Sequence, residues 1–261
     1  MPDLQHTHEV AYDGDVVTKR YLGTKPGAAE REWRALTLLA EHAPGLAPRP
    51  IAFEAGVVSM SRLDGVPLRG LPAPGEHAAA LADALAELHA AVPARVLRDV
   101  PVRPWQREAV CDWIRLQGAR WRPRGPLADR AVREGLRWLA GWRPGESGVT
   151  PVFGAGDGNL ANFLWDGSRV RIVDFEDSGR SDLAYELAEL AEHVSMWVDG
   201  DLEIARRFEL SPQEERRLRE CRKAHTLVWL FLLSHDDPAD PRNPPGTFDR
   251  QAERVLATLG A

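Results

Sequence analysis

Lysine is scarce in this chain of 261 residues. Of its 33 basic residues, only Lys19, Lys25 and Lys223 are lysines, which leaves 30 arginines. Because arginine stands at nearly every basic position, each lysine that remains calls for an explanation. Lys19 is of most interest, since it lies inside the strand-like run of residues 16–21.

Other scarce features exclude whole classes of protein. Two cysteines, Cys111 and Cys221, form neither a disulfide framework nor a zinc site. No apolar run reaches the roughly 18 residues of a transmembrane helix, and the polar N-terminus carries no signal sequence. A net charge of −6 argues against a general nucleic-acid binder. We therefore expect a cytoplasmic protein that binds neither nucleic acid nor membrane, and its oligomeric state stays open.

The first 60 or so residues combine short strands with one helix. Two β-rich runs around an Asp-Gly turn at residue 13 predict a hairpin over residues 8–21. Apolar residues at three- and four-residue spacing predict a helix over 28–42. A second hairpin is expected over 51–61, which completes a β-β-α-β-β unit.

The remainder of the chain is mostly helical. Helices are predicted over 76–91, 105–118, 127–142, 183–197, 212–234 and 247–259, with one hairpin over 162–174. Gly and Pro residues mark a connector before the first of these helices. The predicted class is α+β with two lobes: a small lobe over 1–63, a connector over 64–75 and a large helical lobe over 76–261.

The densest group of polar residues lies in two neighbouring segments, 153–162 and 172–177. Glycines at 154, 156 and 158 permit an irregular backbone that exposes Asp157. Asn162 follows five residues later, and the hairpin returns Asp174 to the neighbourhood of Asn162. Oxygen ligands of this kind suit Mg²⁺.

The spacing of Asp157 and Asn162 fits the catalytic-loop pattern D-x-x-x-x-N of kinases, in which a later Asp also holds metal. The simpler alternative is a polar surface turn beside an ordinary hairpin. An EF-hand is excluded, because Ala161 stands where a third oxygen ligand is needed. The Val-Asp-Phe end of the hairpin favours the catalytic interpretation.

A kinase site also needs a lysine for the phosphates and an acidic partner for that lysine. Alternation along the strand places Val17, Lys19 and Tyr21 on one face. Glu32 on the following helix is the preferred partner, and Glu30 is a second candidate. The alternative is an exposed lysine with two solvated glutamates.

With these segments in view, the chain resembles the aminoglycoside phosphotransferase and choline kinase superfamily, small-molecule kinases with a protein-kinase-like fold. The segments that carry the resemblance are 16–21, 30–39, 57–68, 84–89 and 156–188. The resemblance implies a phosphotransferase that uses ATP and Mg²⁺ to phosphorylate a hydroxyl of a small molecule. The acceptors that the resemblance implies are an aminoglycoside-like antibiotic, a choline-like molecule or another metabolite, and they include cationic molecules.

The resemblance also implies roles for individual residues. Asp157 is the catalytic base, and Asn162 and Asp174 bind Mg²⁺. Lys19 with Glu32 positions the phosphates of ATP. The backbone from Ser61 to Leu63 is the adenine-binding hinge, and Met60 is the gatekeeper beside the adenine pocket.

Two departures from the family pattern keep an alternative open. Ala155 replaces a histidine that braces the catalytic loop, and Gly14 is the only glycine before Lys19, so the phosphate-covering loop is short. The alternative is a catalytically weak or inactive protein that binds a nucleotide or small molecule on the same fold. A protein kinase is less favoured, because no Asp-Phe-Gly or Ala-Pro-Glu motif occurs.

Acidic residues near the catalytic segments suggest an acceptor site. Glu176, Asp177 and Glu189 are candidates for attracting a cationic acceptor, together with His193. Glu186 and Glu192 share a helix with Glu189, and a solvated stripe is the equal alternative. For the tryptophans, nine in all, helix packing is preferred over an aromatic box for an amine.

Overall fold

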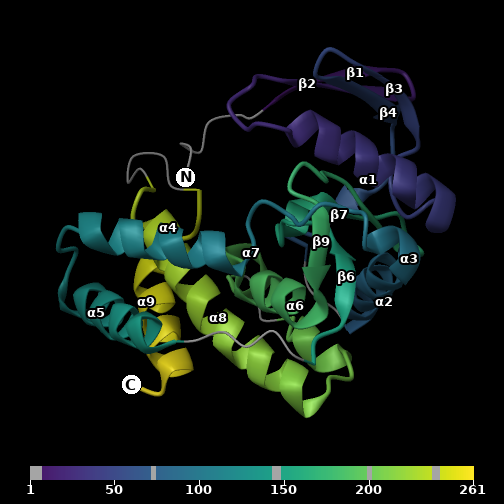
Figure 1. The fold of residues 1–261 in the computed structure, drawn as a ribbon. Coiled ribbons are helices and arrows are strands. Elements are labelled where there is room, and N and C mark those ends of the chain that lie inside the picture. Colours follow the sequence, from purple (N-terminus) through teal and green to yellow (C-terminus); the bar gives the residue numbers. More distant parts are fainter. Residues whose placement is uncertain (1–7, 72–74, 143–147, 199–201, 237–241) are drawn as a thin grey trace. The chain divides into compact units, whose positions relative to one another are not determined.

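The computed structural model describes residues 8–71, 75–142, 148–198, 202–236 and 242–261. The chain forms two compact units (Figure 1). Unit 1 comprises residues 1–104 and 151–182, and unit 2 comprises residues 105–150 and 183–261. The two units are defined by their internal contacts and do not test the expected lobes. The lobe boundaries at 63 and 75 therefore stay a prediction. Residues 72–74 of the expected connector lie outside the described residues.

Unit 1 begins with a four-stranded antiparallel sheet and a helix. Its strands are β1 (His8–Asp13), β2 (Val16–Tyr21), β3 (Pro50–Glu54) and β4 (Val57–Ser61), in the order β1-β2-β4-β3. Helix α1 (Ala28–His42) packs on β3 and β4 with its apolar face buried. Both hairpins and this helix confirm the sequence-based expectation.

The register of this sheet fixes the position of Lys19. On β2, Lys19 pairs with Val10 of β1 and with Val58 of β4, so it lies at the centre of the sheet. The β1–β2 connection has only two residues between its strands, and Gly14 there has a φ of 55°. Gly suits this turn because a left-handed backbone is strained for most other residues.

The rest of unit 1 surrounds the segment that carries Asp157. Its elements are α2 (Gly75–Ala91), α3 (Ala94–Leu97), β5 (Val66–Pro67), β6 (Pro151–Gly154), the 3-10 helix η1 (Leu160–Asn162), β7 (Phe163–Trp165), β8 (Val170–Ile172) and β9 (Gly179–Asp182). Strands β5, β7 and β8 form one small sheet, and β6 pairs with β9 in another. The β7–β8 hairpin was expected, whereas β5, β6 and β9 were not.

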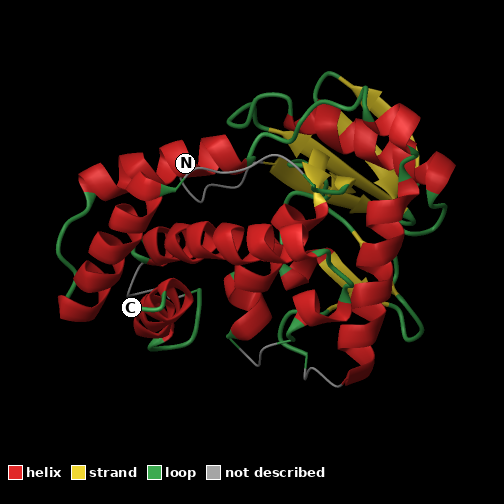
Figure 2. Ribbon diagram, turned by 60° about the horizontal axis from the view of Figure 1, so that its bottom comes forward, coloured by secondary structure: helices red, strands yellow, loops and turns green. Residues whose placement is uncertain are grey.

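Unit 2 is helical, as Figure 2 shows. Its helices are α4 (Arg107–Arg120), α5 (Pro126–Gly141), α6 (Leu183–Glu192), α7 (Val194–Trp197), the 3-10 helix η2 (Ile204–Arg207), α8 (Pro212–Leu233) and α9 (Thr247–Leu259). Helix α8 packs against α4, α5, α6 and α9. Trp113 and Trp142 are buried in this core, which agrees with helix packing as the role of the tryptophans.

The single helix expected over residues 183–197 is wrong in one respect. The chain breaks at His193, where ψ is 132°, and continues as the short helix α7. His193 Nδ1 accepts a hydrogen bond from the Ser195 backbone N–H, so the imidazole caps α7. A side-chain cap of this kind stabilises a new helix start within a sequence whose apolar spacing is continuously helical.

No helix among the described residues is long and apolar enough to cross a membrane.

Candidate functional site

Lys19 and Glu32 form a buried ion pair. Lys19 Nζ donates to Glu32 Oε1 over 3.4 Å, and the Glu32 side chain is fully buried. The period of α1 turns Glu32 toward the sheet with Ala28, Ala35 and Leu36, whereas Glu30 is exposed. The structure therefore selects Glu32, the preferred of the two candidates, as the partner of Lys19.

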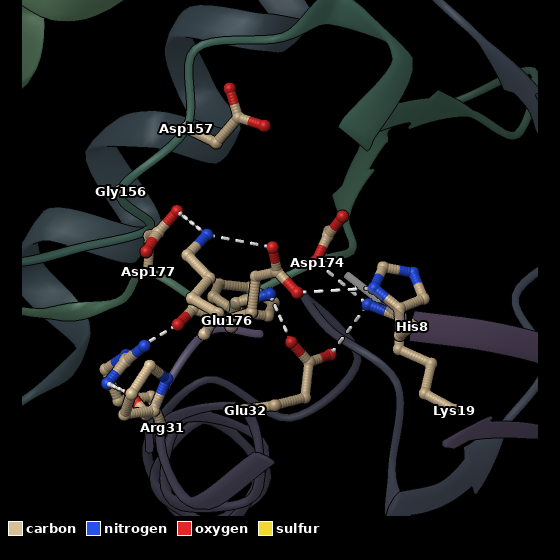
Figure 3. Close-up of polar contacts among 12 residues, drawn as sticks. His8, Lys19, Arg31, Glu32, Gly156, Asp157, Asp174, Glu176 and Asp177 are labelled. Carbon is tan, nitrogen blue, oxygen red and sulfur yellow. Dashed lines mark hydrogen bonds and ion pairs between the residues drawn. The ribbon is translucent and has the colours of Figure 1, made fainter. Parts of the chain in front are cut away.

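Lys19 also contacts Asp174, which follows the end of β8. Nζ lies 2.9 Å from Asp174 Oδ1 (Figure 3). Asp174 has a φ of 69°, a left-handed conformation that is uncommon for a residue other than glycine. Such strained conformations persist where the surrounding structure holds them, and the contact with Lys19 helps to hold this one.

A third contact joins helix α1 to the same segment. The Phe175 backbone N–H donates to Glu32 Oε2 over 2.5 Å. Glu32 therefore uses one carboxylate oxygen for Lys19 and the other for the residue after Asp174. The Lys19 ammonium is held between two carboxylates. Burial lowers the pKa of Lys19, but Glu32 and Asp174 together outweigh that effect and raise it, so the ammonium stays protonated.

Asp157 lies in an irregular loop between β6 and η1. Asp157 Oδ1 accepts from the Asn159 backbone N–H over 3.0 Å, and Oδ2 accepts from Asn162 Nδ2 over 2.9 Å. Burial, followed by the charge of Asp174, raises the pKa of Asp157 to about 6, against the effect of these two hydrogen bonds. A carboxylate whose pKa lies near neutrality is suited to accept a proton.

The backbone around Asn162 ties the Asp157 loop to the Asp174 strand. The Val173 N–H donates to the Asn162 carbonyl over 2.9 Å, and Phe163 pairs with Ile172 across the β7–β8 ladder. The hairpin thus brings Asn162 and Asp174 to one end of the small sheet, as the sequence predicts.

The donor set at this end of the hairpin fits Mg²⁺. The amide nitrogen of Asn162 is used by Asp157, and the amide oxygen is then available for a cation. Asp174 binds Lys19 through Oδ1, which leaves Oδ2. One amide and one carboxylate oxygen are few ligands, and Mg²⁺ completes such sets with water and phosphate oxygens. Within the described ranges, no group of three or more His, Cys, Asp and Glu side chains is arranged to hold a metal.

The predicted adenine-binding residues lie at the end of β4. Met60 is buried opposite Val17 of β2. Ser61 is held in place because its N–H donates to the Arg49 carbonyl and its Oγ accepts from the Arg49 N–H, each over 2.9 Å. Leu63 is half-buried and has left the sheet. Their role toward a nucleotide stays a prediction.

Glu176 and Asp177 are joined by Lys25, whose importance the sequence did not reveal. Lys25 Nζ donates to Glu176 Oε1 over 2.9 Å and also to Asp177. His8 Nδ1 lies 3.2 Å from Glu176 Oε2. Burial raises the pKa of Glu176, but His8 and Lys25 outweigh burial and lower it to about 2. Both acidic side chains therefore already have cationic partners in this chain.

The other two candidates for the acceptor site belong to unit 2. Glu189 is half-buried on α6, and His193 is buried with its ring centroid 4.3 Å from that of Trp229. Glu192, on the same helix, is fully buried between Arg222 and Arg254, over 2.5 and 2.8 Å. Glu192 is thus part of the helical core and not of a solvated stripe. The roles of Glu189 and His193 stay predictions. A second acidic cluster after α8 was also a candidate for attracting a cationic acceptor, and it consists of Asp236, Asp237 and Asp240. Asp237 and Asp240 lie outside the described residues.

A sequence model of the phosphotransferase enzyme family matches residues 7–221. Among solved structures, the chain is similar to a choline/ethanolamine kinase family protein from Mesorhizobium loti, with 22% identity and a TM-score of 0.64 over 98% of this chain and 86% of that one. It is also similar to the choline kinase LicA from Streptococcus pneumoniae, with 15% identity and a TM-score of 0.58 over 100% and 92% of the two chains. An aminoglycoside 2′-phosphotransferase-IIIa gives 17% identity and a TM-score of 0.61 over 98% and 90%.

A search of curated protein sequences finds no match. The likeness to solved structures shows the fold, which is the protein-kinase-like fold expected from the sequence. The family match covers most of the chain and includes Lys19, Glu32, Asp157, Asn162 and Asp174. The chain therefore belongs to the phosphotransferase enzyme family and is a small-molecule kinase.

Proposed function

We propose that this chain transfers the γ-phosphoryl group of ATP to a hydroxyl group of a small molecule, in a reaction that requires Mg²⁺. The observation that carries the proposal is the position of Lys19 Nζ, which lies 3.4 Å from Glu32 and 2.9 Å from Asp174. Kinases require a lysine that is ion-paired with a helix glutamate, together with an aspartate that holds Mg²⁺, and Lys19, Glu32 and Asp174 are the residues proposed for these roles.

Lys19 provides a positive charge for the phosphates of ATP, and Glu32 holds the ammonium group of Lys19 in place. Asn162 and Asp174 provide oxygen ligands for Mg²⁺, which neutralises the phosphate oxygens when it is bound. Asp174 Oδ1 contacts Lys19, so the positive charge and the proposed metal ligand lie next to each other. Met60, Ser61 and Leu63 are proposed to line the adenine site at the end of β4.

Asp157 is the proposed base. The acceptor oxygen forms a bond to the γ-phosphorus while the bond to the β–γ bridging oxygen breaks. ADP leaves with that electron pair, and the hydroxyl proton passes to Asp157. A pKa of about 6 leaves Asp157 largely ionised at neutral pH and still able to take up a proton. Its hydrogen bonds to Asn159 and Asn162 fix the orientation of the carboxylate.

The acceptor is proposed to be a small alcohol, either cationic or neutral. The choline kinase and the aminoglycoside phosphotransferase described above are named for cationic molecules. Here Lys25 already pairs with Glu176 and Asp177, so a positive charge on the acceptor is not needed to balance these two carboxylates. A panel of acceptors should therefore include amines, aminoglycosides, macrolides and neutral alcohols.

The decisive experiment separates nucleotide binding from transfer. Thermal denaturation with ATP, with and without Mg²⁺, should show stabilisation that depends on both, followed by phosphate transfer to at least one acceptor of the panel. Asp157→Ala should abolish transfer while ATP still binds, and Asp174→Asn should remove the Mg²⁺ dependence of binding. Full transfer by Asp157→Ala would contradict the proposal.

A second candidate function is a nucleotide-binding protein without turnover. The observation in its favour is Ala155, which is buried at the position where the family pattern has a histidine. Stabilisation by ATP and Mg²⁺ without transfer to any acceptor would favour this candidate.

A further inference from the structure

Arg103 is one of the most deeply buried charged residues of the chain. In the sequence it follows α3 and precedes α4, and only 1% of its surface is exposed. A guanidinium group stays charged in proteins, and burying a charge is costly unless it is paired and hydrogen-bonded. A reason is therefore needed for placing an arginine here.

The guanidinium of Arg103 is directed at the loop that carries Asp157. Arg103 Nη2 donates to the Gly156 carbonyl over 2.9 Å, and Gly156 immediately precedes Asp157. Burial raises the pKa of Asp177, and the positive charges of Lys25 and then of Arg103 act in the opposite direction without outweighing burial. Arg103 thus interacts with the Asp157 loop and with the segment that follows Asp174.

Two close backbone approaches fix the guanidinium relative to the loop. Gly156 has a φ of 87°, and a Cβ placed there would lie 2.2 Å from the Asp177 carbonyl oxygen. A Cβ placed on Gly179 would lie 2.7 Å from the Arg103 backbone nitrogen and 2.8 Å from the Pro101 carbonyl oxygen. Only glycine fits at either point, so the Asp157 loop, residues 177–179 and the backbone of Arg103 are packed in direct contact.

The backbone of Arg103 is itself anchored. Its N–H donates to the Arg180 carbonyl over 3.2 Å, and the Arg180 N–H donates to the Pro101 carbonyl over 3.0 Å. Residues 101–103 therefore lie against β9, which pairs with β6 at the base of the Asp157 loop. A side chain that extends from this anchored segment to Gly156 holds the loop at the residue next to Asp157.

We propose that Arg103 is a positioning residue for phosphoryl transfer: it holds the Gly156 carbonyl so that Asp157 meets the acceptor hydroxyl in the reactive geometry. This inference rests on the proposed function of Asp157. Displacement of a reacting group by about 1 Å can lower a rate on the order of 100-fold. The guanidinium contacts the residue next to the proposed base, so its loss should affect kcat more than the KM for ATP.

The test compares Arg103→Lys and Arg103→Met with Arg180→Met. Arg180 Nε donates to the Val100 carbonyl over 3.3 Å, so the control removes a guanidinium bond in the same part of unit 1 without altering the Gly156 contact. Lysine keeps the buried charge but donates from one nitrogen on a shorter side chain, and methionine keeps volume without charge. The readouts are kcat, the KM for ATP, thermal stability, and amide hydrogen exchange in peptides covering residues 153–162 and 16–32.

We expect both Arg103 variants to lower kcat about 10- to 100-fold per folded molecule, with the KM for ATP within about threefold. Exchange should rise in residues 153–162 and not in 16–32, and Arg180→Met should keep the wild-type kcat. Unchanged kcat and exchange in folded Arg103→Lys would overturn the inference. An equal fall in kcat for Arg180→Met would also overturn it, because the effect would then not depend on the Gly156 contact. Failure of both Arg103 variants to fold would overturn it as well, because Arg103 would then serve stability.

The outcome is distinguishable from a failure of the proposed function. If the wild-type chain transfers phosphate to no acceptor, the proposed function is wrong. The exchange measurement still decides whether Arg103 holds the Asp157 loop, because it needs neither nucleotide nor acceptor.

Discussion

The backbone N–H of Phe175 donates to Glu32 Oε2 over 2.5 Å, although the two residues lie 143 positions apart in the chain. Glu32 is thus more than the counter-ion of Lys19, since it also holds the residue after Asp174. One buried carboxylate on α1 fixes both the lysine and the hairpin end that are proposed to meet the phosphates.

Substitutions at Glu32 should separate these two tasks. Glu32→Gln keeps an acceptor oxygen for Phe175 but removes the charge that pairs with Lys19, so ATP affinity should fall about tenfold with the fold retained. Glu32→Ala removes both bonds and leaves a buried ammonium, and should also cost about 3 kcal/mol of unfolding free energy. Calorimetry with an ATP analogue and denaturant titration measure the two effects. Equal stability of the two variants would contradict a separate role for the Phe175 bond.

Lys19→Arg tests whether the scarce lysine is chosen for its shape. Lys19 is buried at the centre of the sheet and contacts two carboxylates from one nitrogen. A planar guanidinium spreads its donors over a wider fork, so it cannot take the place of the single ammonium nitrogen between Glu32 and Asp174. Nucleotide affinity and turnover should both fall at least about tenfold. Lys223→Arg is the control, because Lys223 lies on α8 of unit 2. Near-normal binding and turnover in Lys19→Arg would show that charge alone is required.

Gly156→Ala should disable the catalytic loop. The added Cβ would lie 2.2 Å from the Asp177 carbonyl oxygen, and the φ of 87° is strained for alanine. Gly167→Ala is a matched control, because Gly167 has a φ of 97° but no atom within 4 Å of the added Cβ. The control should cost about 1 kcal/mol of stability from backbone strain, with activity retained. Gly156→Ala should cost about 2 kcal/mol more and lose turnover. Similar results for the two variants would show that no close packing against Asp177 exists.

The parts of this site that could be predicted are those whose sequence pattern spans only a few neighbouring residues. Lys19 and Glu32 were found because strand alternation and helix periodicity each act within a few residues. The five-residue spacing placed Asp157 beside Asn162, and one short hairpin brings Asn162 and Asp174 together. Lys25 and Arg103 were missed, since their partners lie about 150 and 53 positions away and no pattern in the sequence connects them.

The same reasoning explains the errors in the fold. Strands β6 and β9 have four residues each, and each has a glycine at its hairpin-facing end, Gly154 and Gly179, so neither shows a period of two. The break at His193 depends on the imidazole capping Ser195, whereas apolar spacing continues across it. Helices α1, α8 and α9 were predicted within one or two residues, because their apolar faces are long and their ends are marked by Gly, Ser or Pro.

Acid should weaken unit 2 through Glu214 at the start of α8. This carboxylate accepts from Thr150 Oγ1 over 2.6 Å and from the Ser211 N–H over 2.9 Å, and these bonds lower its pKa to about 2. A lowered pKa in the folded state gives stability that is complete above the unfolded value and is lost as pH falls toward the folded value. The difference in unfolding free energy between wild type and Glu214→Gln should therefore be constant near neutrality and shrink between about pH 4.5 and about pH 2.

Denaturant titrations at several pH values measure this difference. Glu215→Gln is the control, because Glu215 is the exposed neighbour of Glu214 on the same helix turn. A difference that stays constant down to pH 3 would show that Glu214 does not carry the effect.

The pairing of Gly154 with Gly179 across β6 and β9 closes the chain on itself. Between these two glycines lie Asp157, Asn162, Asp174, Glu176 and Asp177, so the proposed base, the metal ligands and the partners of Lys25 all belong to one segment. Strand β5 and the Glu32 carboxylate hold the same segment from outside, through β7 and Phe175. Loss of activity on warming should therefore coincide with the melting of unit 1, with this segment and its supports acting as one cooperative unit.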